Sequence, residues 1–126
     1  MHLKRSLADK LFSDLVRIKA DWTCERCFTK YDPPTMALHC SHFFGRGGKS
    51  TRWDFENASS LCYGCHRYFT ANPNEHQIFF MKRLGEKKYN ALVLRAHTPT
   101  KVDEKSLVIA FKETLKRMKS GILGAH

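Results

Sequence analysis

Two cysteine pairs constrain this chain more than any other feature. Cys24 and Cys27 form one Cys-x-x-Cys motif, and Cys62 and Cys65 form another, with 34 residues between the two motifs. This spacing is typical of a tetrahedral site in which four thiolates bind one zinc ion. Four thiolates complete the coordination of zinc, so we expect a structural ion that holds the fold and takes no part in chemistry.

The length and charge of the chain narrow the class of protein. A chain of 126 residues has room for one domain, and it contains no apolar run long enough for a membrane span or a secretion signal. We therefore expect a cytoplasmic protein with no membrane partner and with reduced cysteines. The 22 Lys and Arg residues outnumber the 12 Asp and Glu residues, and the resulting charge of +10 favours a polyanionic partner such as nucleic acid.

Apolar residues at helical spacing flank the region that holds the cysteines. Residues 6–20 are predicted to form an amphipathic helix with Ser6 as its N-cap, and residues 75–120 are predicted to form C-terminal helices, two of them over 75–84 and 86–96. Residues 22–74 contain the cysteines, several glycines and short β-like runs. The predicted fold class is therefore α+β, a single domain with a small zinc-stabilised core between helices.

The segment between the cysteine pairs predicts two strands followed by a helix. We expect a strand over residues 36–44, a glycine-rich turn over 45–49 and a returning strand over 52–61, after which the second cysteine pair begins a helix. The first strand carries His42, the second carries Asn57, and His66 lies at the start of the helix. Two strands and a helix with these three residues resemble the ββα-metal, or HNH, nuclease motif.

The flanking residues narrow the resemblance to one family. The run from Glu56 to His66 is similar to the second half of zinc-containing HNH nucleases, and residues 9–27 are similar to the helix and first zinc knuckle of the lambdoid-phage NinG (Rap) family. Residues 41–43 and the helix pair around Gly85 continue the similarity. The resemblance implies a phage recombination endonuclease that cuts branched DNA, such as Holliday junctions, D-loops and flaps, in an infected or lysogenic bacterial cell.

Phosphodiester hydrolysis explains why these residue types occur together. His42, neutral near pH 7, is the expected general base that takes a proton from the attacking water. His66 is expected to bind a catalytic divalent cation, Mg²⁺ or Mn²⁺, over the scissile phosphate. The side-chain amide of Asn57 is expected to tie the second strand to the loop and so to orient His42.

Two positions depart from the family pattern. NinG proteins and phage endonuclease VII carry Asn directly after the last zinc cysteine, where this chain has His66, and either residue can bind a cation. Many HNH enzymes place Asp or His before the base as a second ligand, whereas this chain has Ser41. His39, Cys40 and additional water are all open candidates for that ligand. For Cys40, the favoured interpretation is a small buried apolar residue and not a ligand.

Basic side chains near His42 are candidates for phosphate contacts. Arg46, Lys49 and Arg52 flank the glycine-rich turn and are expected to bind DNA beside the cut. Resolving a four-way junction takes two cuts, so a homodimer is the expected form for that role, paired through the apolar faces of the C-terminal helices.

Two other functions fit the same sequence. One is an HNH nuclease for ordinary duplex DNA, of the nicking or packaging-associated kind. The other is a non-catalytic zinc module that binds nucleic acid through its basic face. The joint presence of His42 and His66 favours a nuclease, because a binding module needs neither residue.

Overall fold

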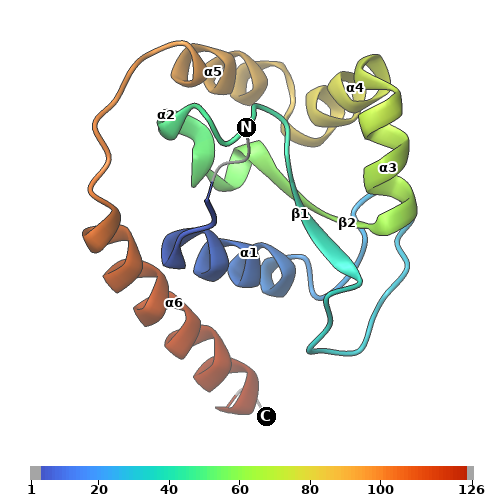
Figure 1. Ribbon diagram of the computed structural model, residues 1–126. Helices are drawn as coiled ribbons and strands as arrows, with labels where there is room; N and C mark the ends of the chain where they lie inside the picture. Colours follow the sequence, from blue (N-terminus) through green and yellow to red (C-terminus); the bar gives the residue numbers. More distant parts are fainter. Residues whose placement is uncertain (1–3, 125–126) are drawn as a thin grey trace.

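The computed structural model has an α+β fold in which α1 and α3 both pack against a two-stranded antiparallel sheet (Figure 1). It describes residues 4–124, with side chains as far as residue 120. In chain order its elements are α1 (Leu7–Lys19), β1 (Leu38–His42), α2 (Lys49–Arg52), the 3-10 turn η1 (Phe55–Asn57), β2 (Ala58–Cys62), α3 (Tyr63–Ala71), α4 (Pro73–Leu84), α5 (Glu86–Ala96) and α6 (Glu104–Gly124). The predicted α+β class is confirmed.

Helix α1 is the predicted N-terminal helix, and it begins at the predicted cap. The backbone N–H of Asp9 donates to Ser6 Oγ at 3.2 Å, and the backbone N–H of Ser6 donates to Asp9 Oδ2 at 2.8 Å. This reciprocal capping box satisfies backbone donors that a helix start leaves unpaired. The apolar side chains of Leu11, Phe12 and Leu15 are buried and hold α1 against the rest of the fold.

Strand β1 pairs with β2 so that His42 lies opposite Ala58 and Leu38 lies opposite Cys62. The predicted strand over 36–44 is thus present in shortened form, and the second cysteine pair lies where β2 passes into α3, as expected. A buried cluster lies at this corner of the molecule; its members are Cys24, Leu38, Leu61, Cys65 and Phe69.

The predicted returning strand over residues 52–61 is wrong in its first half. A short helix, a 3-10 turn and only then β2 occupy this stretch of the chain. Asp54 favours the turn because its carboxylate accepts the backbone N–H of Glu56 at 2.9 Å, which competes with strand pairing. Arg95 of α5 binds the same carboxylate at 2.7 Å and holds the turn in place.

The predicted helices over 75–84 and 86–96 are confirmed as α4 and α5. Helix α4 begins earlier than predicted, at Pro73, because proline suits the first helical position. Gly85 separates the two helices with a φ of 81°, a conformation that side chains with a Cβ rarely adopt. None of the helices in the described part of the chain combines the length and apolar character needed to cross a membrane.

Helix α6 returns alongside α1 (Figure 1). Phe111 and Leu115 are buried there with Leu11, Phe12 and Leu15 of α1. The apolar stripe of α6 is therefore covered inside the molecule. Phe111 and Leu115 pack on α1 of the same chain, so they are not free to pair two protomers, and the homodimer itself stays a prediction.

Candidate functional site

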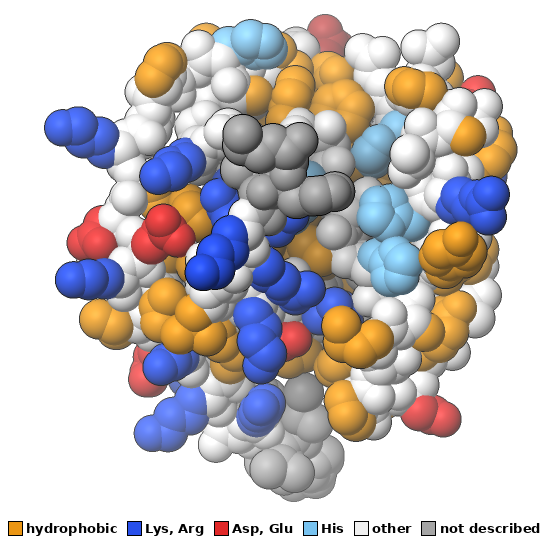
Figure 2. All heavy atoms as spheres, viewed as in Figure 1, with side chains coloured by type: hydrophobic (Ala, Val, Ile, Leu, Met, Phe, Trp, Pro, Cys, Tyr) orange, Lys and Arg blue, Asp and Glu red, His pale blue; other side chains and the backbone are white. Residues whose placement is uncertain are grey.

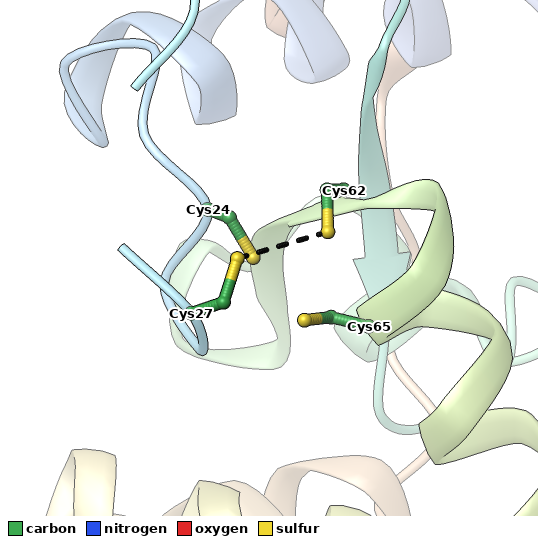
Figure 3. A group of neighbouring side chains, drawn as sticks. All are labelled: Cys24, Cys27, Cys62 and Cys65. Atoms are coloured by element: carbon green, nitrogen blue, oxygen red, sulfur yellow. Dashed lines mark hydrogen bonds between the residues drawn. The ribbon is translucent and has the colours of Figure 1, made fainter. Parts of the chain in front are cut away.

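The four predicted zinc cysteines converge on one point. Figure 3 shows Cys24 and Cys27 on one loop facing Cys62 and Cys65 at the junction of β2 and α3. Their sulfur atoms lie within 4.8 Å of one another, and the Sγ atoms of Cys27 and Cys62 are 3.9 Å apart. Zinc–sulfur bonds of about 2.3 Å in a tetrahedron separate neighbouring sulfurs by roughly 3.8 Å. The four side chains could therefore bind one zinc ion.

Local hydrogen bonds shape the loop that carries the first cysteine pair. The backbone N–H of Cys24 donates to the carbonyl of Thr29 at 2.9 Å, and Phe28 turns the chain with a φ of 63°. Glu25 docks this loop on β2: its backbone N–H donates to the carbonyl of Ser60 at 2.8 Å, and its carboxylate accepts the Ser60 N–H at 2.6 Å. The two cysteine pairs are thus brought together by protein contacts as well as by any shared ion.

Two of the four thiol groups have shifted pKa values, in opposite directions: burial raises the pKa of Cys65 to about 12, whereas hydrogen bonds lower that of Cys27. The hydroxyl of Thr29, 3.2 Å from Cys27 Sγ, lowers the pKa of Cys27 to about 6. Arg26 places Nη1 3.4 Å from Cys65 Sγ. A cation at this distance offsets part of the negative charge of a four-thiolate cluster.

A cavity of about 570 Å³ lies beside the sheet and collects most of the predicted catalytic residues. Its lining comes from α1 and the segment before it, from β1 and the loops on either side of it, and from α3. The lining residues are Arg5, Asp9, Ser13, Arg17, Met36, His39, Cys40, His42, Gly45, Arg46 and His66. Figure 2 shows histidine side chains gathered on one side of the face it presents, next to a band of Lys and Arg side chains. The cavity therefore combines groups that can exchange protons with groups that can bind phosphate.

Among the residues that the structure describes, only one ring nitrogen of His42, Nε2, has a hydrogen-bond partner. Its Nε2 lies 2.8 Å from the backbone carbonyl of Arg52. A carbonyl only accepts, so Nε2 carries the proton and Nδ1 keeps its lone pair. Burial lowers the pKa of His42 below its usual 6.5, which keeps the imidazole neutral at physiological pH. Such an imidazole can accept a proton through Nδ1.

Asn57 ties the loop after β1 to the start of β2, as predicted. It is fully buried, and its Oδ1 accepts the backbone N–H of Phe44 at 2.8 Å. Its Nδ2 donates to the carbonyls of Phe44 at 2.9 Å and Thr51 at 3.0 Å. The amide thereby holds both ends of the loop that separates His42 from the carbonyl of Arg52, and it acts on His42 through that loop.

His66 lies beside His39, one of the candidates for the second ligand of the catalytic cation. Its Nδ1 is 2.9 Å from Nδ1 of His39, and the two ring centroids are 5.2 Å apart. Burial lowers the pKa of His66, and the neighbouring His39 lowers it further. The pair joins the middle of β1 to the first turn of α3.

Two further residues of β1, Ser41 at the family's ligand position and the candidate Cys40, are less suitable as ligands. Ser41 is 1% exposed and is absent from the lining of the cavity. Cys40 does line the cavity, but it lies outside the four-cysteine group, and burial raises the pKa of its thiol to about 11. Cys40 is half-buried and packs against the core, so the prediction of a small buried residue is met only in part.

The three predicted phosphate contacts have different positions. Arg46 lines the cavity with His42, whereas Lys49 lines two other hollows and not this one. Arg52 is only 8% exposed, and its Nε donates to the Asp9 carboxylate at 2.9 Å. The assignment of Arg52 as a DNA contact is therefore corrected: its guanidinium neutralises a buried carboxylate, Asp9, whose pKa is about 2.

Sequence reasoning missed a polar stripe on α1 that faces the cavity. Asp9, Ser13 and Arg17 are spaced four residues apart, and Arg5 precedes them at the same interval. Residues four apart share one helix face, so the stripe was visible in the sequence. All three helical members are buried, and Arg17 Nε donates to the carbonyl of Leu38 at 2.8 Å.

No protein-family model matches the chain, and no curated protein and no solved structure is detectably similar to it. Function is therefore inferred from the geometry of the zinc cluster and of the cavity.

Proposed function

We propose that this protein is a metal-dependent DNA endonuclease of the HNH, or ββα-metal, type. The observation that carries the proposal is the placement of His42 and His66 in one cavity at the junction of two strands and a helix. Asn57 supports it by holding the loop next to His42 through three hydrogen bonds. These are the three residues that define the resemblance in the sequence.

Three residues of the cavity, His42, His66 and Arg46, have roles that phosphodiester hydrolysis requires. Nδ1 of His42 accepts a proton from the attacking water, since the carbonyl of Arg52 holds the opposite nitrogen in its protonated form. His66 would hold the divalent cation, which would supply charge neutralisation at the phosphate. Arg46 binds the phosphate chain beside it, because its guanidinium lies in the same cavity and is one-third exposed.

Branched DNA is the finer part of the proposal, and it rests on the resemblance to the NinG family. The positive charge of the chain supports binding to any DNA, because phosphate contacts carry no information on shape. Preference for a junction or a flap has to come from the geometry of the DNA.

The test is a cleavage assay with the purified, zinc-loaded chain. Linear, nicked, flapped and four-way DNA of matched length are incubated with Mg²⁺, Mn²⁺ or EDTA at moderate salt. The proposal predicts cation-dependent cuts, with branched DNA cut faster than linear duplex. Equal cutting of all substrates would support the nuclease proposal and reject the preference for branched DNA. Binding of DNA without any cut would instead indicate a non-catalytic zinc module.

A further inference from the structure

We propose that His39 and His66 together form the cation site, and that this site selects a transition-metal ion over Mg²⁺. The inference deepens the proposed function and takes its catalytic meaning from it. The binding site itself can be measured without DNA and without catalysis.

The pair has the separation that two ligands of one ion require. The two Nδ1 atoms lie 2.9 Å apart, and both residues line the cavity that contains His42. Two nitrogens bound to one ion at about 2.1 Å lie roughly 3.0–3.4 Å from each other, depending on the angle between the bonds. A small outward movement of either ring accommodates the ion.

The elements that carry the pair hold it firmly. His39 is paired in the middle of the β1–β2 ladder, opposite Leu61, and His66 lies in the first turn of α3. The ring of Tyr63 approaches His39 edge-on at a centroid distance of 6.0 Å, so the side chain is contacted from the helix side as well. Such support keeps two imidazoles together without a third protein ligand and leaves positions for water or phosphate oxygens.

The chemistry of the surrounding side chains decides which ion fits. Mg²⁺ prefers oxygen ligands, above all carboxylates, whereas imidazole suits Zn²⁺, Ni²⁺ and related ions. Asp9 is the only carboxylate among the described residues that line the cavity. Its oxygens are already occupied by Arg52, Trp53 and the Ser6 cap. The site therefore has imidazole nitrogens to bind a cation, whereas the one carboxylate that lines it is already engaged in other contacts.

Isothermal titration calorimetry of the full, zinc-loaded chain with Ni²⁺ and with Mg²⁺ tests the inference. Zinc content is followed in parallel to show that the thiolate site does not exchange. We expect one Ni²⁺ per chain, bound at least about tenfold more tightly than Mg²⁺. His39→Ala and His66→Ala should each weaken Ni²⁺ binding about tenfold or more, whereas His97→Ala, which changes an exposed histidine of the C-terminal half, should leave it unchanged.

A second variant separates ligation from packing. His39→Asp replaces the nitrogen donor with a carboxylate, so it should raise the affinity for Mg²⁺ relative to Ni²⁺, which a purely structural His39 would not do. Unchanged Ni²⁺ affinity in folded His39→Ala, or Mg²⁺ binding as tight as that of Ni²⁺, would overturn the inference while leaving the nuclease proposal standing. Selective Ni²⁺ binding by a protein that cuts no DNA would support the site and reject the nuclease.

Discussion

Arg52 serves two neighbouring groups through different atoms. Its guanidinium binds the buried carboxylate of Asp9, and its backbone carbonyl accepts the proton of His42 Nε2. The side chain therefore stabilises the fold, whereas the backbone orients the candidate base. A substitution at Arg52 should act on folding first and on His42 only through the position of the backbone.

The variant Arg52→Gln should lower the free energy of unfolding by about 3 kcal/mol, because it removes the nearer of the two cations of buried Asp9 and leaves, among the described residues, only Arg46, 3.8 Å away. Urea unfolding followed by circular dichroism measures this loss. In the wild type, the pKa of Asp9 is lowered from 3.8 to about 2, so its contribution is complete above about pH 4 and is lost as the pH falls through 2. A folded Arg52→Gln protein of wild-type stability would contradict the structural role.

Arg46 and Lys49 form a matched pair for testing phosphate contact, because each substitution removes one positive charge from the same loop region. Arg46 lines the cavity of His42, and Lys49 does not. Arg46→Ala should slow DNA cleavage about tenfold through the loss of charge-assisted hydrogen bonds, while Lys49→Ala should change it little. Equal effects in single-turnover assays would show that only net charge matters.

The zinc knuckle, formed by residues 24–27 and 62–65, joins the first loop to the junction of β2 and α3. Cys62→Ser should lose zinc and unfold most of the chain, because metal binding supplies much of the folding free energy of small metal-stabilised domains. Zinc content and circular dichroism measure both effects together. Cys40→Ser provides the control: it should keep one zinc per chain, since Cys40 lies outside the cluster.

Short-range sequence patterns predicted those helices and strands whose formation depends mainly on residues close to them in the chain. The cap at Ser6 and the helical periodicity of 75–96 act within a few residues, so α1, α4 and α5 could be predicted. The zinc cluster could be predicted over a longer distance, because each Cys-x-x-Cys pair is itself a local motif. The stretch over 52–57 could not, because its turn depends on Asp54 and on Arg95, which lies 41 residues further on.

The cavity also depends on contacts between residues far apart in the sequence, and these could not be predicted. The sequence placed His42, Asn57 and His66 in one motif, but the burial of Arg52 depends on Asp9, 43 residues earlier. Periodicity shows that a helix has a polar stripe and does not show whether that stripe faces solvent or a cavity. The proposal of His39 as the second ligand required the distance to His66 across the strand–helix junction, which the sequence does not give.

The packing of α6 on α1 changes what removal of the C-terminus should do. Truncation before Val102 removes Phe111 and Leu115 and exposes the apolar face of α1. We expect a loss of several kcal/mol in unfolding free energy, since burying one large apolar side chain contributes about 1.5–3 kcal/mol. Urea unfolding of the truncated and full chains checks this. Wild-type stability after truncation would instead favour α6 as an arm that pairs protomers.

The pH dependence of DNA cleavage should report the protonation of His42 in the cavity. A protonated His42 cannot accept a proton, and burial lowers its pKa below 6.5, so cleavage should be constant near neutral pH and fall as the pH drops through that lowered pKa. The profile should be recorded above the range in which acid weakens zinc binding, with zinc content as the control.

Single-turnover cleavage of four-way DNA by His42→Ala, beside His97→Ala, tests the nuclease assignment most directly. Both variants remove one imidazole, but only His42 lines the cavity. The structure predicts that His42→Ala folds, keeps its zinc and cuts at least about 100-fold more slowly than the wild type, while His97→Ala cuts at the wild-type rate. A folded, zinc-loaded His42→Ala protein that cuts at the wild-type rate would contradict the account.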